Sequence, residues 1–209
     1  MSLPSRLLGA NPSIQVSTLL SGSLTTPSAK QAFVISGNFD SISSYTVTGT
    51  DASITFSSIP STYTHLQVRG IARSNGSLKT GPIFVTVNGD TGTNYGSQGS
   101  LINHSGLGLI AYYDNAAPTY YAQRHTGSLA PSNYFGSTVF NIIDYKNTSK
   151  SKIFLGEVGG ALAGAMADNV TSSSFGGHWR NTNAITSITL TPNSGSWIAG
   201  TTFSLYGIV

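Results

Sequence analysis

Residues 184–209, AITSITLTPNSGSWIAGTTFSLYGIV, decide the fold class that the sequence predicts. Two runs rich in β-branched and aromatic residues flank a loop punctuated by proline and glycine, and this pattern predicts a β-hairpin. In the second run Phe203, Leu205 and Val209 share one face at a period of two, whereas Tyr206 falls on the opposite face. We therefore expect the chain to close with a strand that buries at least one face.

The preceding sequence repeats this kind of pattern, because short strand-like runs separated by turn residues recur from residue 31 onward. Strands are expected at residues 42–47, 53–56, 65–72, 83–87, 107–113, 135–145, 152–158, 184–190 and 201–209. The run at 135–145 is apolar on both faces, which predicts a central strand. Residues 161–167, ALAGAMA, are too short for an independent helix and are expected to form a loop or a single turn. Together these runs predict an all-β fold, a jelly-roll-like antiparallel β-sandwich.

The chain is expected to hold one domain, at residues 31–209, preceded by an extended N-terminal arm at residues 1–30. The arm is rich in Ser, Thr, Leu and Pro and sustains neither a helical nor a strand period. Fixing such a segment costs about 1–2 kcal/mol per residue in backbone entropy, so an ordered arm needs an extensive contact. That contact is expected either along its own domain or, as we favour, between neighbouring subunits.

The surface is predicted to be polar but nearly uncharged. Of the 209 residues 39% are hydrophobic and only 8% are charged, well below the usual quarter or so. A surface with so few charges has little repulsion to keep copies apart and suits a permanent homo-oligomer. The formal net charge of +3 comes with no run of Lys or Arg, so nucleic acid is not an expected partner.

Neither a disulfide framework nor a membrane anchor is expected. The chain has no cysteine, which excludes disulfides, thiolate metal sites and a cysteine nucleophile. The first residues, MSLPSRLLGANPS, lack the apolar centre of a secretory signal, and no apolar run is long enough for a membrane helix. If the protein acts outside a cell, we expect it to leave without a signal of its own.

The sequence gives no support for an enzyme. A glycan-cleaving site needs two carboxylates across a cleft, yet the chain has seven acidic residues in all, and Glu157 is its only glutamate. The four histidines show neither the HExxH spacing nor any other zinc-binding spacing. We therefore predict no catalytic residues, no cofactor and no metal.

The most oxygen-rich stretch is NGDTGTNY, in which Asn88, Asp90 and Asn94 alternate with glycines. Such a loop can offer several oxygens to calcium, although the spacing of an EF-hand and its final glutamate are missing. The Asn-Gly pair after a strand-like run is a strong hairpin signal, so a tight turn is the favoured interpretation.

Six aromatic residues beside loop-like stretches are candidate glycan or interface residues: Tyr112, Tyr113, Tyr120, Tyr121, Trp179 and Trp197. Sugar rings dock on aromatic faces, with amides and carboxylates nearby to fix their orientation, so these side chains could line a glycan site. Tyr and Trp are also favoured in subunit interfaces and cores, and these roles are the favoured interpretation.

Three stretches together resemble a recurrent group of tailed-bacteriophage virion proteins: ITFSSIPSTYTHLQVRGIARS from Ile54, VTVNGDTGTNY from Val85, and AITSITL with GSWIAGTTFSLYGI at the end. In that group a stretch of the form F-x-x-I-P-x-x-Y-x-x-L leads the domain and T-F-x-L-Y-G closes it. The likeness covers residues 54–209, and the opening LPSRLLG also resembles the start of phage particle proteins.

This resemblance implies a jelly-roll-like domain, often trimeric, of the kind used in capsid decoration proteins, head fibres and tail-associated proteins. It carries over no catalytic residue. We expect a capsid cement or decoration protein on the exterior of the virion, a homotrimer in contact with the major capsid protein or other virion proteins. The alternative is a tail-associated module that binds a host surface glycan.

Overall fold

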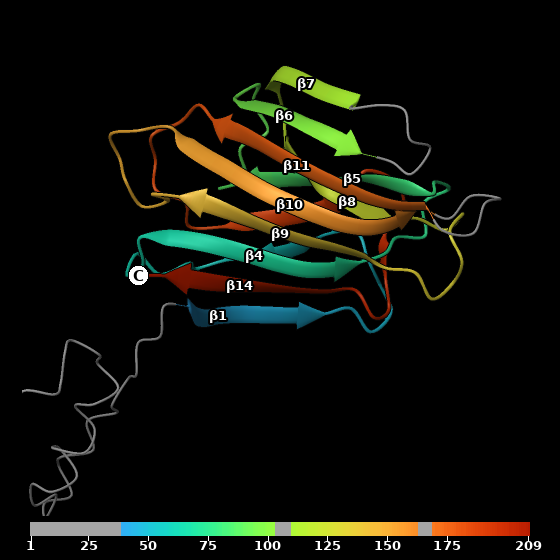
Figure 1. Ribbon diagram of the computed structural model, residues 1–209. Helices are drawn as coiled ribbons and strands as arrows, with labels where there is room; N and C mark the ends of the chain where they lie inside the picture. Colours follow the sequence, from blue (N-terminus) through green and yellow to red (C-terminus); the bar gives the residue numbers. More distant parts are fainter. Residues whose placement is uncertain (1–38, 103–109, 163–168) are drawn as a thin grey trace, which may run out of the picture. The chain divides into compact units, whose positions relative to one another are not determined.

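The computed structural model describes residues 39–102, 110–162 and 169–209, which belong to one compact unit, Asn38–Val209 (Figure 1). Every regular element within these residues is a β-strand, so the predicted all-β class is confirmed. None of them forms a helix long and apolar enough to cross a membrane. The predicted arm at residues 1–30 lies outside the described part of the chain.

The strands, in chain order, are β1 (Phe39–Thr46), β2 (Thr50–Asp51), β3 (Ile54–Phe56), β4 (His65–Ala72), β5 (Thr80–Val87), β6 (Tyr95–Ile102), β7 (Ile110–Ala117), β8 (Tyr120–Thr126), β9 (Gly136–Ile143), β10 (Lys152–Leu162), β11 (Asn169–Trp179), β12 (Ile188–Pro192), β13 (Trp197–Ile198) and β14 (Thr202–Ile208). An eight-stranded sheet has the order β1-β14-β4-β9-β10-β11-β6-β7, and a four-stranded sheet has the order β3-β12-β5-β8. A two-stranded ladder joins β13 and β2. All named strand pairs are antiparallel.

The two larger sheets pack face to face as a jelly-roll-like sandwich, with the small sheet behind the large one in Figure 1. Strand β8 of the small sheet contacts β9, β10 and β11 of the large sheet. Alternate residues fill the space between the sheets, because side chains along a strand point to opposite faces. In β5 these are Ile83, Val85 and Val87, and in β14 they are Phe203 and Leu205, all of them buried.

The predicted hairpin between the last two strands is wrong. Strand β12 pairs with β3 and β5 in the small sheet, whereas β14 pairs with β1 and β4 in the large sheet. The connection therefore crosses the sandwich, a distance of about 10 Å between stacked sheets. Trp197 fills this crossing: its side chain is buried and its Nε1 donates to the carbonyl of Leu190 at 3.1 Å.

The inward face of the closing strand is confirmed for Phe203 and Leu205 but not for Val209, which is 69% exposed. Strand β14 ends at Ile208, which pairs with Phe39 and His65, and no strand of the described residues pairs with Val209.

The two motifs that carry the phage resemblance meet in space. In the leading motif Phe56 and Ile59 are buried, and the ring of Tyr63 packs against Gly207 of the closing motif. A side-chain carbon at Gly207 would lie 2.2 Å from that ring, so only glycine allows the contact. The hydroxyl of Tyr145 donates to the carbonyl of Pro60. The leading segment is thereby fastened across the end of the closing strand.

Several strands were not predicted, namely β2, β6, β8, β11 and β13. Strands β6 (YGSQGSLI) and β11 (NVTSSSFGGHW) are rich in Gly and Ser and lack an apolar alternation. They extend because each pairs on both sides along the large sheet. The central place predicted for residues 135–145 is confirmed, because β9 lies between β4 and β10.

Two further predictions fall at the limits of the described residues. Of the predicted loop at 161–167, residues 161 and 162 are instead the end of β10, because they pair with β11, and the remainder lies outside the description. The strand predicted at 107–113 corresponds to β7, and residues 107–109 are likewise outside.

Replacement of Phe203 by Ala should lower the free energy of unfolding by about 3–5 kcal/mol, the usual cost of emptying a large aromatic position in a core. Phe203 is fully buried, with its ring centroid 5.4 Å from that of Trp197. The matched control is Phe39→Ala, because Phe39 is 47% exposed and its ring lies under the Arg69 guanidinium, a contact worth about 1 kcal/mol or less. Urea unfolding of both variants checks this, and equal losses would show that β14 does not bury its inward face.

Candidate functional site: the open face of the large sheet

Three of the six candidate aromatic residues belong to the core. Tyr120, Trp179 and Trp197 are each at most 1% exposed. The ring of Tyr120 stacks on Phe154 with centroids 4.5 Å apart, and Trp197 packs edge-on against His125 at 5.1 Å. These three side chains cannot offer a ring face to a sugar.

The other three do not form a site together. Tyr121 is half-buried on the opposite side of β8 from Tyr120, where its ring meets Phe84 edge-on at 5.2 Å. Tyr112 and Tyr113 belong to β7, the last strand of the large sheet, and their side chains lie outside the description. The candidates are thus divided between the core and strands of different sheets.

The loop that holds Asn88, Asp90 and Asn94 begins with the predicted tight turn. Asn88 and Gly89 both have positive φ, 52° and 67°, and the N–H of Asp90 donates to the carbonyl of Val87 at 2.9 Å. Two left-handed residues in succession are typical of the hairpin turn that an Asn-Gly pair favours.

The polar groups of this loop bind other parts of the protein. One carboxylate oxygen of Asp90 accepts from the backbone N–H of Gly92 at 2.8 Å, and the other accepts from Asn94 at 2.9 Å and from Trp179 Nε1 at 2.6 Å. Asn88 Oδ1 accepts from the backbone N–H groups of Thr186 and Ser187. Burial raises the pKa of the Asp90 carboxyl, but its hydrogen bonds outweigh that effect and hold the pKa below its ordinary value.

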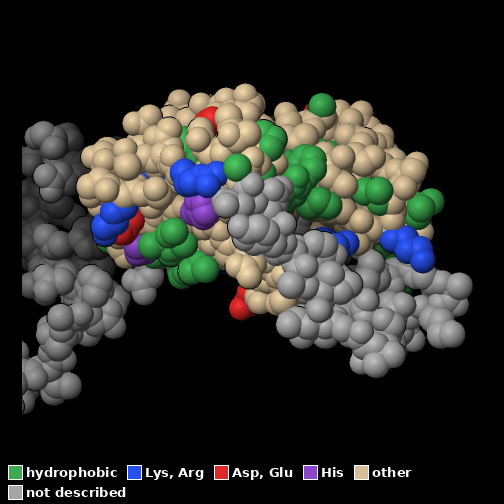
Figure 2. All heavy atoms as spheres, turned by 90° about the horizontal axis from the view of Figure 1, so that it is seen from above, with side chains coloured by type: hydrophobic (Ala, Val, Ile, Leu, Met, Phe, Trp, Pro, Cys, Tyr) green, Lys and Arg blue, Asp and Glu red, His purple; other side chains and the backbone are tan. Residues whose placement is uncertain are grey.

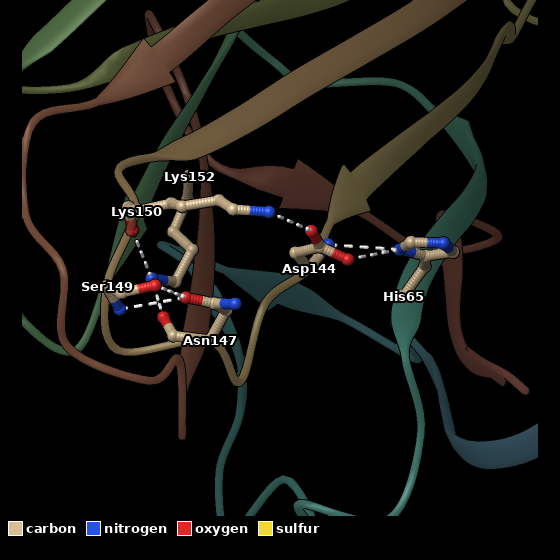
Figure 3. Close-up of polar contacts among 6 residues, drawn as sticks. All are labelled: His65, Asp144, Asn147, Ser149, Lys150 and Lys152. Carbon is tan, nitrogen blue, oxygen red and sulfur yellow. Dashed lines mark hydrogen bonds and ion pairs between the residues drawn. The ribbon is translucent and has the colours of Figure 1, made fainter.

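A second polar cluster lies where β9 connects to β10 (Figure 3). Asp144, which has a φ of 50°, lies between His65 and Lys150, with its carboxylate 3.6 Å from His65 Nδ1 and 3.4 Å from Lys150 Nζ. The backbone N–H of Asp144 donates to His65 Nδ1 at 3.0 Å. This bond occupies the ring nitrogen that faces the carboxylate, so the pair fastens the turn and is not arranged as a general base.

The buried residue Lys152 lies beside this cluster. Its ammonium group donates to the carbonyl oxygens of Asn147, Lys150 and Thr182, at 2.5, 2.9 and 2.9 Å, and the residue is fully buried. Burial lowers the pKa of Lys152, and nearby Asp144 partly opposes that effect. The three carbonyls belong to two connecting segments, which the lysine therefore ties together.

The surface that remains for a partner is the outer face of the large sheet, which Figure 1 views directly. We call it the open face and define it by the outward side chains of β1, β14, β4, β9, β10, β11 and β6. The row that crosses its middle, read from the register of neighbouring strands, consists of Ser44, Ser204, Arg69, Val139, Glu157, Ser174 and Ser100. No described residue covers this face.

The open face combines hydroxyl groups with half-exposed apolar side chains. Hydroxyls bond across neighbouring strands, such as Ser44 to Ser204 at 2.7 Å and Thr46 to Thr202 at 2.9 Å. The most exposed large apolar residues on this face are 39–54% exposed: Phe39, Ile71, Val139, Ile153 and Leu155. A set of this size on one face of a protein with so few charges is typical of an interaction surface.

Charged side chains are few among the described residues on the face of the molecule that Figure 2 shows. On the open face, among its described side chains, the only Asp, Glu, Lys or Arg residues are Arg69 and Glu157, on either side of Val139. In the sequence Glu157 stands out only as the single glutamate, because nothing in the sequence of β10 indicates its neighbours across the sheet.

No protein-family model, curated protein or solved structure is significantly similar to the chain. Within the described residues, no group of three or more His, Asp or Glu side chains is close enough to hold a metal ion. Among the described surfaces, the open face therefore offers the geometry from which a function can be inferred.

Replacement of Asp90 by Asn should cost about 1–3 kcal/mol at neutral pH, because one of the two oxygens that accept hydrogen bonds becomes an amide donor. The pKa of Asp90 is lowered in the folded protein, so its contribution is complete above the ordinary carboxyl pKa of about 4. That contribution is lost as the pH falls through the lowered value, so the gap between the two proteins should narrow in acid. Urea unfolding at several pH values checks this, with Asp40→Asn as the control, and a gap that widens in acid would contradict it.

Proposed function

We propose that this chain is a structural protein of a tailed-bacteriophage particle, a capsid cement or decoration protein on the particle's exterior. The observation that carries the proposal is the open face, where half-exposed apolar residues and hydroxyl rows surround one Arg and one Glu among the described side chains. Such a face suits a permanent assembly, because it costs little to desolvate and offers no repulsion between copies. The likeness of residues 54–209 to phage virion proteins supports the same function.

In this proposal the β domain forms a homotrimer, and the N-terminal arm attaches it to the major capsid protein or to other virion proteins. Arg6 and Lys30 are the only charged residues in residues 1–30, which otherwise offer apolar and hydroxyl groups for contact. The closing strand of the domain is paired on both sides, so it offers no free strand edge for attachment to the particle.

The alternative, a tail-associated module that binds a host glycan, has weaker support. It relied on six aromatic residues, of which Tyr120, Trp179 and Trp197 are buried in the core. No described aromatic cluster replaces them near Glu157, whose surroundings are mainly glycine, serine and aliphatic residues.

The number and position of copies on the particle test the proposal. Quantitative mass spectrometry of purified particles that contain the chain, combined with immunogold labelling, should find it in hundreds of copies over the head. A few copies confined to the tail would contradict the cement function and favour the glycan-binding alternative.

Removal of residues 1–30 should abolish attachment to the particle and leave the β domain folded, because the described core lies entirely within residues 47–205. Co-sedimentation of the truncated protein with particles stripped of the chain measures attachment, and circular dichroism measures folding. The control is the full chain with Lys30→Ala, which should still bind. Full occupancy by the truncated protein would contradict the proposed function of the arm.

A further inference from the structure

The open face is divided into a bulky half and a shallow half. The bulky half lies on β1, β14 and β4, where the guanidinium of Arg69 lies over the rings of Phe39 and Tyr206, 5.0 and 4.7 Å from their centroids. Arg69 Nε also donates to Gln67 Oε1 at 2.5 Å. These contacts hold the cation on its own half of the face, where Ile71, 54% exposed, also lies.

The shallow half lies on β9, β10, β11 and β6. Small residues such as Gly159, Gly176 and Ser174 leave two adjoining troughs there, of about 420 and 550 Å³, which share Val139, Glu157 and Ser174. The volume is open because these positions carry few side-chain atoms.

Glu157 is the one charge in these troughs, and its carboxylate has no hydrogen bond or ion pair with any described residue. Arg69, in the same row, is held toward Phe39 and Tyr206 and so does not neutralise it. A carboxylate among half-exposed Val139 and Leu155 gains from a cation supplied by a partner, because the apolar surroundings strengthen the attraction.

We propose that the occupant of the shallow half is a second copy of this chain, whose bulky half enters the troughs so that its Arg69 pairs with Glu157. The inference rests on the homotrimer of the proposed function and names its interface: three open faces surround a three-fold axis that runs parallel to β9. A rotation about such an axis keeps each residue at the same level along the strands, and Arg69 and Glu157 share one level.

The neighbouring rows fit the same arrangement. In the next row along the strands, Ile71 and Gly159 both pair with Ser137 and therefore lie at the same level. The exposed isoleucine of one copy then meets a glycine of the next copy. In the row on the other side of Val139, Gln67 and Leu155 share a level. The Val139 side chains of the three copies then face the axis, where their exposed surface is removed from water.

The size of the face is sufficient for a stable assembly. The seven strands of the open face at a spacing of about 4.8 Å, each with seven residues rising about 3.3 Å, make a face of roughly 780 Å². A typical specific interface buries about 800 Å² per partner. A free peptide or a glycan could enter the troughs, but neither accounts for a cation held at the same level on the other half of the face.

Charge reversal in the full chain tests the pairing. Wild-type protein should sediment with the mass of three chains, and Arg69→Glu or Glu157→Arg should raise the concentration at half-dissociation by about 30-fold or more. The double variant, Arg69→Glu with Glu157→Arg, should regain the trimer because it restores the pair with reversed signs. Lys79→Glu, on an exposed residue outside the open face, is the control and should leave the trimer unchanged.

Rescue by the double variant separates pairing from general destabilisation, because two destabilising changes would not restore each other. Single variants that remain trimeric, or a double variant that stays dissociated while folded, would overturn the inference but leave the trimer of the proposed function intact. A wild-type monomer would overturn both. The wild-type protein could instead sediment as a dimer that dissociates in the single variants and forms again in the double variant. That result would support the Arg69–Glu157 pairing but overturn both the three-fold axis and the proposed trimer.

Discussion

The small sheet packs against one face of the large sheet, so no described strand covers the other face. The covered face holds the aromatic core around Tyr120, Phe140 and Phe154, where β8 packs against the centre of the large sheet. Only 8% of the residues are charged, so few charged side chains are available for the uncovered face. Rows of hydroxyls therefore alternate with half-exposed aliphatic side chains, and such a surface is better suited to a partner than to water.

The few charged side chains of the domain are used largely to hold connections in place. Arg73 is buried and donates to the backbone carbonyls of Ala130, Pro131 and Tyr134, at 2.8, 2.6 and 2.8 Å. Lys152 binds three carbonyls in the same manner. Burial lowers the pKa of both groups, but each donates to several oxygens, which offsets the cost of removing a cation from water. Arg69 and Glu157 differ from these residues, because both remain on the open face.

The sequence predicts strands well where one face alternates, as in β4, whose bounds match the expected run at 65–72. It fails for β6 and β11, whose Gly- and Ser-rich sequences become strands only through pairing on both sides. It also fails for the pairing of β12 and β14, because periodicity gives the buried face of a strand and not the sheet to which it belongs. Trp179 and Trp197 stand beside Gly or Ser in the sequence, a pattern that predicts loops, yet both side chains are buried in the core.

The functional surface could not be predicted for a related reason. Arg69, Val139 and Glu157 are far apart in the sequence and become neighbours only through the β4-β9-β10 register. Neither Arg69 nor Glu157 belongs to a motif, and their significance depends on the aromatic rings that hold the arginine and on the small residues that leave the carboxylate uncovered.

The central claim is that copies of the chain meet through the open face. Because the chain has no native cysteine, a double variant with Ile71→Cys and Gly159→Cys, which keeps Arg69 and Glu157, tests this most directly by oxidation and non-reducing electrophoresis. If the copies meet as inferred, oxidation should give disulfide-linked species of two and three chains that are absent from a variant with cysteine at 71 alone. Oxidised protein that remains entirely single-chain, at concentrations where wild type is assembled, would contradict it.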